Sequence, residues 1–270
     1  MATVNDIVLE VMRIAPGWLA EEWDNVGLLV GDGAAEVQRV MTCLTVTPAT
    51  AAEAIVGGAG LVVAHHPMPF RPLKRLTGDT TVGRLLLDLI AARVAVCSAH
   101  TAFDSAELGI NARLAEGLGL VDVAPLLPVE HATRPDAPES PSLGTGRIGR
   151  LPDTLSLAQL SERLKRFLDV ERLRYVGLSD QTIERVAVGC GAAGSLLDDA
   201  IASRCDCMVL GETNFHTCLE AEARGVALLL PGHYASERFA MTSLAAMLAE
   251  RFPSVGIWPS RDECDPVQWG

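Results

Sequence analysis

Five of the six histidines in this chain lie where a run of apolar, strand-like residues ends: His65, His66, His100, His216 and His233. The sixth, His131, lies in a stretch that is typical of a linker. In open α/β sheets, ligands bind in the crevice outside the carboxyl ends of the strands. Imidazole and carboxylate groups gathered at that edge would be ligands for zinc, iron or manganese. The pattern therefore predicts a metal site, and one that holds more than one ion.

Two acidic residues follow histidines at the same spacing. Asp104 lies four residues after His100, and Glu237 lies four residues after His233. On a helix, residues four apart project from the same face. Each carboxylate also has an ordinary explanation, since Asp104 could cap the helix that follows it and Glu237 could interact with a helix N-terminus. The repetition of this arrangement at equivalent strand ends favours the metal site.

His65 and His66 are adjacent, which limits how they could share one ion. Neighbouring residues of a regular strand point to opposite faces of the sheet. The two imidazoles would therefore bind separate ions, or the chain would turn at Pro67 so that both reach one site. The alternative is one buried structural histidine beside an exposed one.

A glycine-rich segment offers a different function. Residues 189–194 match the pattern G-x-G-x-x-G between a predicted strand and a predicted helix, and Glu212 follows at about the distance of a ribose-binding acid. This match supports a dinucleotide-binding alternative. Residues 144–149 match the same pattern with no strand before them, so the pattern is weak evidence in a chain with 24 glycines. A simpler interpretation of 189–195 is a tight turn whose backbone amides could bind a phosphate.

Apolar periodicity predicts the elements that position these side chains. Strands and helices alternate along the chain, which is typical of βαβ units with parallel neighbouring strands. Strands are expected at 40–46, 60–64, 94–98, 186–189, 208–210, 226–230 and 255–258. Helices are expected at 4–12, 48–56, 81–92, 110–118, 157–168, 196–202, 217–223 and 237–252.

The second half of the chain repeats the pattern of the first. We expect an α/β protein of two related α/β lobes, with mixed, largely parallel sheets flanked by helices and a metal site between the lobes. The N-terminal lobe would span 1–125 and the C-terminal lobe 147–270, and the two would form one compact unit. A linker at 126–146, rich in Pro, Ser and Gly, would join them.

Composition narrows the class of protein. The chain has 270 residues, of which 49% are hydrophobic, so a globular protein is expected. Its net charge of −12 makes nucleic acid and anionic membranes poor candidates for partners. The N-terminus lacks a basic region followed by an apolar stretch, and no apolar run approaches ~20 residues, so neither a signal peptide nor a transmembrane helix is expected. The seven cysteines have no zinc-ribbon spacing and are expected to be reduced, in a cytoplasmic protein.

Read in order, several segments resemble the GTP cyclohydrolase I type 2-like family, also called the Nif-three-like family of dinuclear-metal hexamers. The matching segments are EEWDNVGLLVG (21–31), VVAHHP (62–67), SAHTAFD (98–104), GINARLAEGLGL (109–120), GRIGRL (146–151), RVAVGCGAAG (185–194), GETNFH (211–216), GHYASERF (232–239) and the terminal Asp265-Pro266. They span nearly the whole chain in the expected order, which makes the resemblance specific.

The resemblance implies a ring-shaped homohexamer of two-lobed subunits, with metal sites facing its cavity. It implies two divalent ions per subunit, held by His65, His66, Asp104, His233 and Glu237. His100 and His216 would lie nearby and are the candidates for catalysis. A larger domain that some members carry near 125–145 is absent. The chain departs from the family at Thr45, where members often have aspartate, and at Ala102, where they often have asparagine.

These observations favour a metal-dependent hydrolase that uses two ions of iron, zinc or manganese. Such ions lower the pKa of a bridging water and supply hydroxide near neutral pH. Asp104 or Glu237 would bridge the ions, and His100 or His216 would act as general acid. The resemblance implies GTP as a substrate, while another nucleotide or a phosphoester is chemically as plausible. The main alternative is a non-enzymatic hexameric metal-binding scaffold or regulatory protein, and NAD binding ranks third.

Overall fold

The computed structural model describes residues 1–129 and 142–268. Its contacts divide the chain into two compact units. Unit 1 comprises Met1–Phe103 and Ala240–Gly270, and unit 2 comprises Asp104–Phe239. The chain therefore passes from one unit to the other twice, within helix α4 (His100–Ser105) and within helix α9 (His233–Arg251).

Unit 1 is built on a five-stranded sheet with the strand order β1-β4-β3-β2-β13. The strands are β1 (Gly27–Val30), β2 (Arg39–Cys43), β3 (Leu61–Ala64), β4 (Ala95–Ser98) and β13 (Gly256–Pro259). The strands β4, β3, β2 and β13 are parallel to one another, and β1 runs antiparallel to β4. The helices are α1 (Val4–Ile14), α2 (Pro48–Val56) and α3 (Thr81–Ala91), with a 3-10 turn at Gly17–Leu19.

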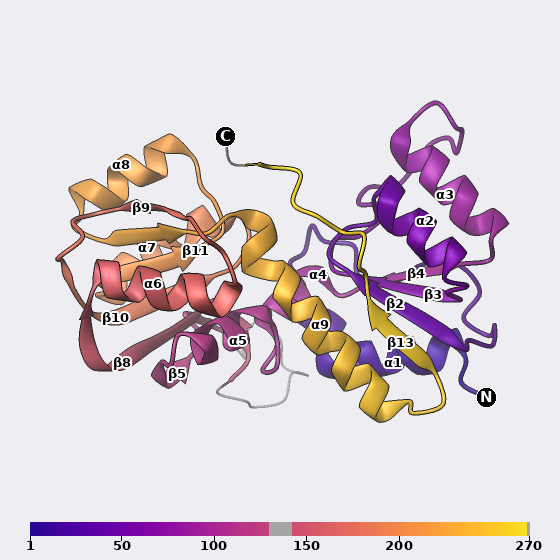
Figure 1. Ribbon diagram of the computed structural model, residues 1–270, viewed down its shortest axis with the longest axis horizontal. Coiled ribbons are helices and arrows are strands. Elements are labelled where there is room, and N and C mark those ends of the chain that lie inside the picture. Colours follow the sequence, from indigo (N-terminus) through magenta and orange to yellow (C-terminus); the bar gives the residue numbers. More distant parts are fainter. Residues whose placement is uncertain (130–141, 269–270) are drawn as a thin grey trace. The chain divides into compact units, whose positions relative to one another are not determined.

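Helices cover both faces of this sheet. α2 and α3 pack on one face, and α1 lies on the opposite side of the sheet (Figure 1). All residues of β3 and β4 are buried, as expected for parallel strands that are covered on both faces. Thr3 and Asp6 form the capping box that begins α1, and Thr47 caps α2 ahead of Pro48. The sheet is thus a fixed base for the loops at its ends.

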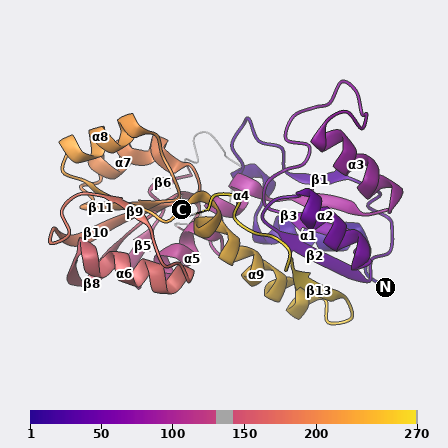
Figure 2. The same cartoon turned by 45° about the horizontal axis from the view of Figure 1, so that its top comes forward.

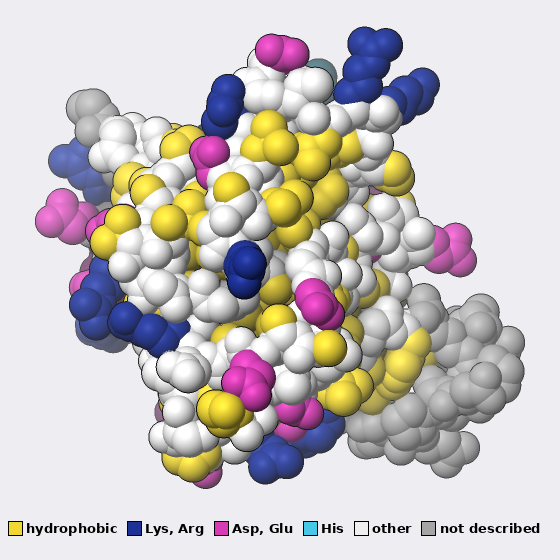
Figure 3. Space-filling model, turned by 90° about the vertical axis from the view of Figure 1, so that its right-hand side faces the viewer, with side chains coloured by type: hydrophobic (Ala, Val, Ile, Leu, Met, Phe, Trp, Pro, Cys, Tyr) yellow, Lys and Arg dark blue, Asp and Glu magenta, His cyan; other side chains and the backbone are white. Residues whose placement is uncertain are grey.

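The outward side of α2 and α3 is apolar in part. Ile55 of α2 and both Val82 and Ile90 of α3 are exposed. Apolar side chains gather on this side of unit 1 in Figure 3. Exposed apolar surface of this kind is a common feature of faces that contact other molecules.

Unit 2 is built on a six-stranded sheet with the strand order β5-β8-β10-β11-β12-β9. The strands are β5 (Val121–Ala124), β8 (Arg147–Ser156), β9 (Arg174–Val176), β10 (Thr182–Gly189), β11 (Cys207–Leu210) and β12 (Ala227–Leu230). The central strands β10, β11 and β12 are parallel, whereas β5, β8 and β9 join antiparallel. A short pair, β6 (Leu127–Pro128) and β7 (Gly144–Thr145), lies apart from this sheet.

The helices of unit 2 also form two layers. They are α5 (Ile110–Gly117), α6 (Leu157–Leu168), α7 (Leu197–Ala202) and α8 (Phe215–Ala223), with a 3-10 turn at Ala193–Leu196. α7 and α8 cover one face of the sheet, and α5 and α6 cover the other (Figure 2). The mixed α/β architecture with flanking helices that the sequence predicts is therefore confirmed in both units. In the part of the chain that is described, no helix combines the length and the apolarity needed to cross a bilayer.

The division between the units differs from the sequence boundaries of 1–125, 126–146 and 147–270. Residues 240–270 belong to unit 1 because β13 adds to the sheet parallel to β2, and residues 104–125 belong to unit 2 because β5 pairs with β8. Such pairings join residues that are far apart in sequence, and local periodicity does not reveal them. Of the expected linker, residues 130–141, with His131, lie outside the described residues.

Candidate metal centre

Three histidines come together in unit 1. One ligand nitrogen of each of His65, His66 and His100 lies within 4.8 Å of those of the other two. The ring centroids of His65 and His66 are 5.1 Å apart, and His100 lies 5.2 Å from the first ring and 5.6 Å from the second. His65 is buried, with 1% of its surface exposed. Imidazole nitrogens at these separations can coordinate a metal ion.

The parallel register of the sheet produces this group. Ala64 at the end of β3 pairs with Ser98 at the end of β4, so the residues that follow both strands emerge at the same edge. The backbone N–H of His65 donates to the Cys43 carbonyl at 3.0 Å, and that of His66 donates to the carbonyl of Leu44 at 2.8 Å. Because regular strand geometry ends at Ala64, the two adjacent imidazoles are not forced to opposite faces.

The backbone of His100 adopts an uncommon conformation. Its φ is 28°, a positive value that costs free energy in any residue with a side chain. Its N–H donates to the carbonyl of His65 at 3.2 Å, which ties the start of α4 to the end of β3. Strained residues of this kind concentrate at functional sites.

A buried carboxylate holds the ring of His100. Asp24 Oδ1 lies 2.7 Å from His100 Nδ1, and Asp24 also accepts hydrogen bonds from the Thr101 hydroxyl and the backbone N–H groups of Thr101 and Asn25. Burial raises the pKa of Asp24, but the hydrogen bonds from His100 and Thr101 outweigh it and lower the pKa to about 2. The ionised carboxylate accepts a hydrogen bond from Nδ1–H of His100 and leaves Nε2 as the atom for coordination or proton transfer.

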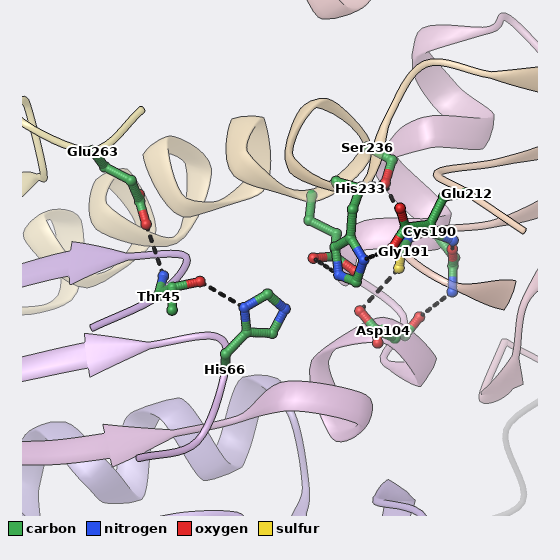
Figure 4. Close-up of polar contacts among 11 residues, drawn as sticks. Thr45, His66, Asp104, Cys190, Gly191, Glu212, His233, Ser236 and Glu263 are labelled. Atoms are coloured by element: carbon green, nitrogen blue, oxygen red, sulfur yellow. Dashed lines mark hydrogen bonds and ion pairs between the residues drawn. The ribbon is translucent and has the colours of Figure 1, made fainter. Parts of the chain in front are cut away.

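The ring of His66 is held by Thr45. Thr45 Oγ1 lies 2.7 Å from His66 Nδ1 (Figure 4). Thr45 is held in turn by Glu263 from the C-terminal segment, whose carboxylate accepts from the backbone N–H of Thr45 at 2.7 Å and of Leu44 at 2.9 Å. Thr45 is therefore in direct contact with a predicted metal ligand.

Unit 2 contains the other predicted ligands. His233 and Glu237 lie in the first turns of α9, and His233 Nε2 is 3.1 Å from Glu237 Oε2. His233 Nδ1 is 2.9 Å from Glu212 Oε1 (Figure 4). The hydrogen bond to Glu237, opposed by burial and supported by Glu212, raises the pKa of His233 to about 9. Two carboxylates on one imidazole favour positive charge at this point, whether a proton or a metal ion carries it.

Asp104 is held by Cys190. The Cys190 thiol donates to Asp104 Oδ1 at 3.1 Å, as Figure 4 shows. Burial and the nearby Asp104 charge raise the pKa of the thiol well above its usual range, which keeps it protonated and able to donate. Asn111 also takes part, because its side chain accepts from the Cys190 N–H at 2.7 Å and donates to the Asp104 carbonyl at 3.1 Å.

The glycine-rich turn packs directly against Glu237. Gly191 has a φ of 59°, and a Cβ at this position would overlap with Glu237 Oε1 and lie 3.3 Å from His233 Nε2. The Gly191 N–H donates to Ser236 Oγ at 3.0 Å. The backbone amides of Cys190 and Gly191 therefore hold side chains of the protein itself, rather than standing open for a phosphate. Glu212, the acid proposed to bind a ribose, lies beside His233 instead.

His216 stands apart from these groups. It is exposed in the first turn of α8, and its ring contacts Phe215 with centroids 6.0 Å apart. Among the described residues, no hydrogen bond joins it to Asp104, His233 or Glu237. The structure thus brings His100 into a histidine group and leaves His216 on the surface.

Sequence reasoning missed the residues that support the ligands: Asp24, Thr45, Cys190, Glu212 and Glu263. Asp24 lies 76 residues from His100 in sequence, and no local spacing links them. The signal that could have found Asp24 is its place in the segment EEWDNVGLLVG, directly after an aromatic residue and before a strand. Carboxylates that accept a hydrogen bond from the other ring nitrogen of a ligand histidine are a general feature of metal sites.

Comparison with known proteins identifies the family of this chain. Residues 2–266 match the model of the family described as Duf34/NIF3 (NGG1p interacting factor 3). The chain belongs to the Duf34/NIF3 family. A Clostridium acetobutylicum relative named GTP cyclohydrolase 1 type 2 homolog is 30% identical over 270 residues, which cover 98% of each chain. A Helicobacter pylori relative named GTP cyclohydrolase 1 type 2 is 31% identical over 242 residues, which cover 88% of each.

Solved structures confirm the fold of this NIF3-family chain. A Bacillus cereus protein related to NIF3 superposes with a TM-score of 0.90 at 24% identity, over 100% of this chain and 99% of that one. A Staphylococcus aureus protein superposes with a TM-score of 0.87 at 25% identity, over 99% of both chains. The family suggested by the sequence segments is confirmed by the family model and the 30% identical relative.

A pair of glycine substitutions tests the close packing against Glu237. Gly225 has a φ of 72° and no neighbour within 4 Å, so Gly225→Ala should lower the free energy of unfolding by about 1–2 kcal/mol through backbone strain alone. Gly191→Ala introduces the same backbone strain and also displaces Glu237, so it should lower the free energy of unfolding clearly more than Gly225→Ala does. Urea denaturation of both variants measures the difference. Equal losses would show that the turn does not confine Glu237.

The Asp24 network predicts a dependence of stability on pH. Asp24→Asn should lower the free energy of unfolding at pH 7 by about 1–3 kcal/mol, because hydrogen bonds to a charged group are lost. The folded pKa of Asp24, about 2, lies below the ordinary 3.8, so its stabilisation is present above pH 3.8 and is lost as the pH falls toward 2. The difference between wild type and variant, from urea denaturation, should therefore be constant from pH 7 to 5 and shrink near pH 3.

The matched control for this series is the exposed Asp88→Asn in α3. It should leave the unfolding free energy within about 0.5 kcal/mol of wild type. An Asp24→Asn protein as stable as wild type at pH 7 would contradict the network.

Proposed function

We propose that this NIF3-family protein binds two divalent metal ions and uses them to hydrolyse a nucleotide or a phosphoester. The proposed ligands are His65, His66, Asp104, His233 and Glu237. The observation that carries the proposal is the group formed by His65, His66 and His100, whose ligand nitrogens lie within 4.8 Å of one another. Imidazole with carboxylate is a donor set that suits iron, zinc or manganese better than calcium or magnesium.

The supporting residues match what a metal ligand requires. Asp24 and Thr45 each occupy one ring nitrogen, on His100 and His66 respectively, and so present the other nitrogen of each ring. On the carboxylate side, the Cys190 thiol orients Asp104. These contacts fix the ligand side chains before any ion arrives, which reduces the ordering cost of binding.

Two bound ions would supply hydroxide near neutral pH by lowering the pKa of water. His100 is not among the five proposed ligands, and because Asp24 holds its Nδ1, its Nε2 is left for proton transfer beside the ions. His216, which is exposed in the first turn of α8, is the second candidate for general acid. The names of the relatives support GTP as the first substrate to try, since both relatives described above are called GTP cyclohydrolase 1 type 2 or its homolog.

We also propose that the protein assembles as a ring-shaped homohexamer. Membership of the family supports this assembly, as does the apolar outward side of α2 and α3. Sedimentation equilibrium measures the assembly directly, and a monomer at micromolar concentration would contradict it.

Elemental analysis together with turnover tests the proposed function. Tag-free protein purified without chelators should contain about two ions per subunit. His65→Ala and Glu237→Gln should each lose metal and lose the hydrolysis of GTP or of a phosphoester together. His216→Ala, which alters an exposed histidine outside the ligand list, should keep its metal, and a loss of turnover in this variant would assign the general-acid role to His216 rather than His100.

Each other outcome has a clear meaning. Full metal content in His65→Ala and Glu237→Gln would refute the ligand assignment. Full metal content with no turnover of any nucleotide or phosphoester would refute the hydrolase and favour the metal-binding scaffold. Circular dichroism of each variant shows whether it is folded.

A further inference from the structure

Two exposed aromatic rings stand beside the histidine group of unit 1. Trp23 is 60% exposed and Phe70 is 41% exposed. Their ring centroids are 5.9 Å apart, and each ring also meets His100 edge-on, Trp23 at 5.9 Å and Phe70 at 6.2 Å. The two rings therefore leave a large aromatic area open next to a candidate metal ligand.

Hydrogen bonds on both sides of Trp23 hold this pair in place. Asp24 accepts from Thr101, and the Glu21 N–H donates to Thr101 Oγ1 at 3.0 Å. The Asn25 side-chain amide donates to the carbonyl of Pro69 at 2.8 Å, which ties the segment of Trp23 to that of Phe70. Rings that are held in advance lose little conformational entropy when a ligand stacks on them.

Positive charge follows Phe70 directly. Residues 70–76 contain Arg71, Lys74 and Arg75 and no acidic residue, in a chain whose net charge is −12. All three cationic side chains are exposed, and within the described residues none of them forms an ion pair. Because Glu21 and Glu22 precede Trp23, the positive charge is concentrated on the Phe70 side of the pair. Guanidinium and ammonium groups of this kind bind phosphate.

We propose that Trp23 and Phe70 form a platform on which the planar heteroaromatic ring of a phosphorylated substrate stacks, while Arg71, Lys74 and Arg75 bind its phosphates. Aromatic side chains bind nucleobases by stacking in this way. A phosphoester without a ring would make no use of the exposed aromatic area, so the arrangement selects a nucleotide from the two substrate classes of the proposed function. This inference rests on the proposed function, because it names the substrate class of the same site.

Calorimetric titration with GTP, guanosine and tripolyphosphate tests the platform, with the metal content of every sample measured in parallel. GTP should bind wild type more tightly than either of the other two compounds. Trp23→Leu and Phe70→Leu should each weaken GTP binding about tenfold or more, and Trp23→Phe should restore most of it. Tyr175→Leu, which removes an exposed ring of unit 2, should bind GTP like wild type.

The charge of the loop has its own variant. The triple substitution Arg71→Gln, Lys74→Gln, Arg75→Gln should weaken the binding of GTP and of tripolyphosphate. It should leave the affinity for guanosine unchanged. It should also reduce the salt dependence of GTP binding, because fewer charges meet the phosphates.

Three binding results would overturn the platform. The Trp23→Leu and Phe70→Leu proteins could bind GTP as tightly as wild type does, wild type could bind tripolyphosphate as tightly as GTP, or wild type could fail to bind GTP at all. A change in subunit assembly in Trp23→Leu would assign the two rings to a contact between copies and would also overturn it. If the wild-type protein still contains metal and turns over substrate, any of these results refutes the platform and leaves the proposed function standing. If the wild-type protein contains no metal, that result alone refutes the proposed function.

Discussion

The parallel pairing of β3 with β2 and β4 is the constraint on which the rest of the candidate site depends. It brings the ends of the strands to one edge and extends the backbone ladder to His65 and His66. A slip of one residue would turn every side chain of β3 to the opposite face of the sheet. The buried core on both faces opposes such a slip, so the same apolar contacts that stabilise unit 1 also determine where the histidines lie.

The residues around the histidines determine what those side chains can do. Asp24 is ionised at all ordinary pH values and makes His100 a stronger donor at Nε2. Thr45 holds His66 through a neutral hydroxyl. A hydroxyl fixes the ring but adds no negative charge, so His66 should be a weaker ligand than a histidine paired with aspartate. The Glu263 contact to Thr45 links this ring to the C-terminal segment.

The sequence predicted what depends on local pattern and missed what depends on distant contacts. The strands that carry the histidines and most of the helices were predicted, because apolar periodicity is local. The boundary between the units was not predicted, because it depends on the pairing of β13 with β2, which lie far apart in sequence. The start of α9 was placed at residue 237, whereas the helix begins at His233. Asp24 and Cys190 were missed as partners of His100 and Asp104 because only the folded chain brings them together.

The glycine-rich turn shows how one pattern can serve two purposes. The sequence of 189–194 fits a phosphate-binding turn as well as a packing turn. In the structure the positive φ of Gly191 lets the backbone pass close to Glu237, and its N–H is taken by Ser236. The pattern predicted a tight turn correctly, and the N–H groups of Cys190 and Gly191 and the carboxylate of Glu212 are taken by side chains of the protein, which favours the packing turn.

X-ray absorption spectroscopy at the edge of the metal in the purified protein tests the central claim most directly. The account predicts nitrogen ligands at about 2.0–2.1 Å if the metal is zinc, with the multiple-scattering signature of several imidazoles. It also predicts that the imidazole signal falls in His66→Ala. A spectrum that contained only oxygen or sulfur ligands, with no imidazole signature, would contradict the account.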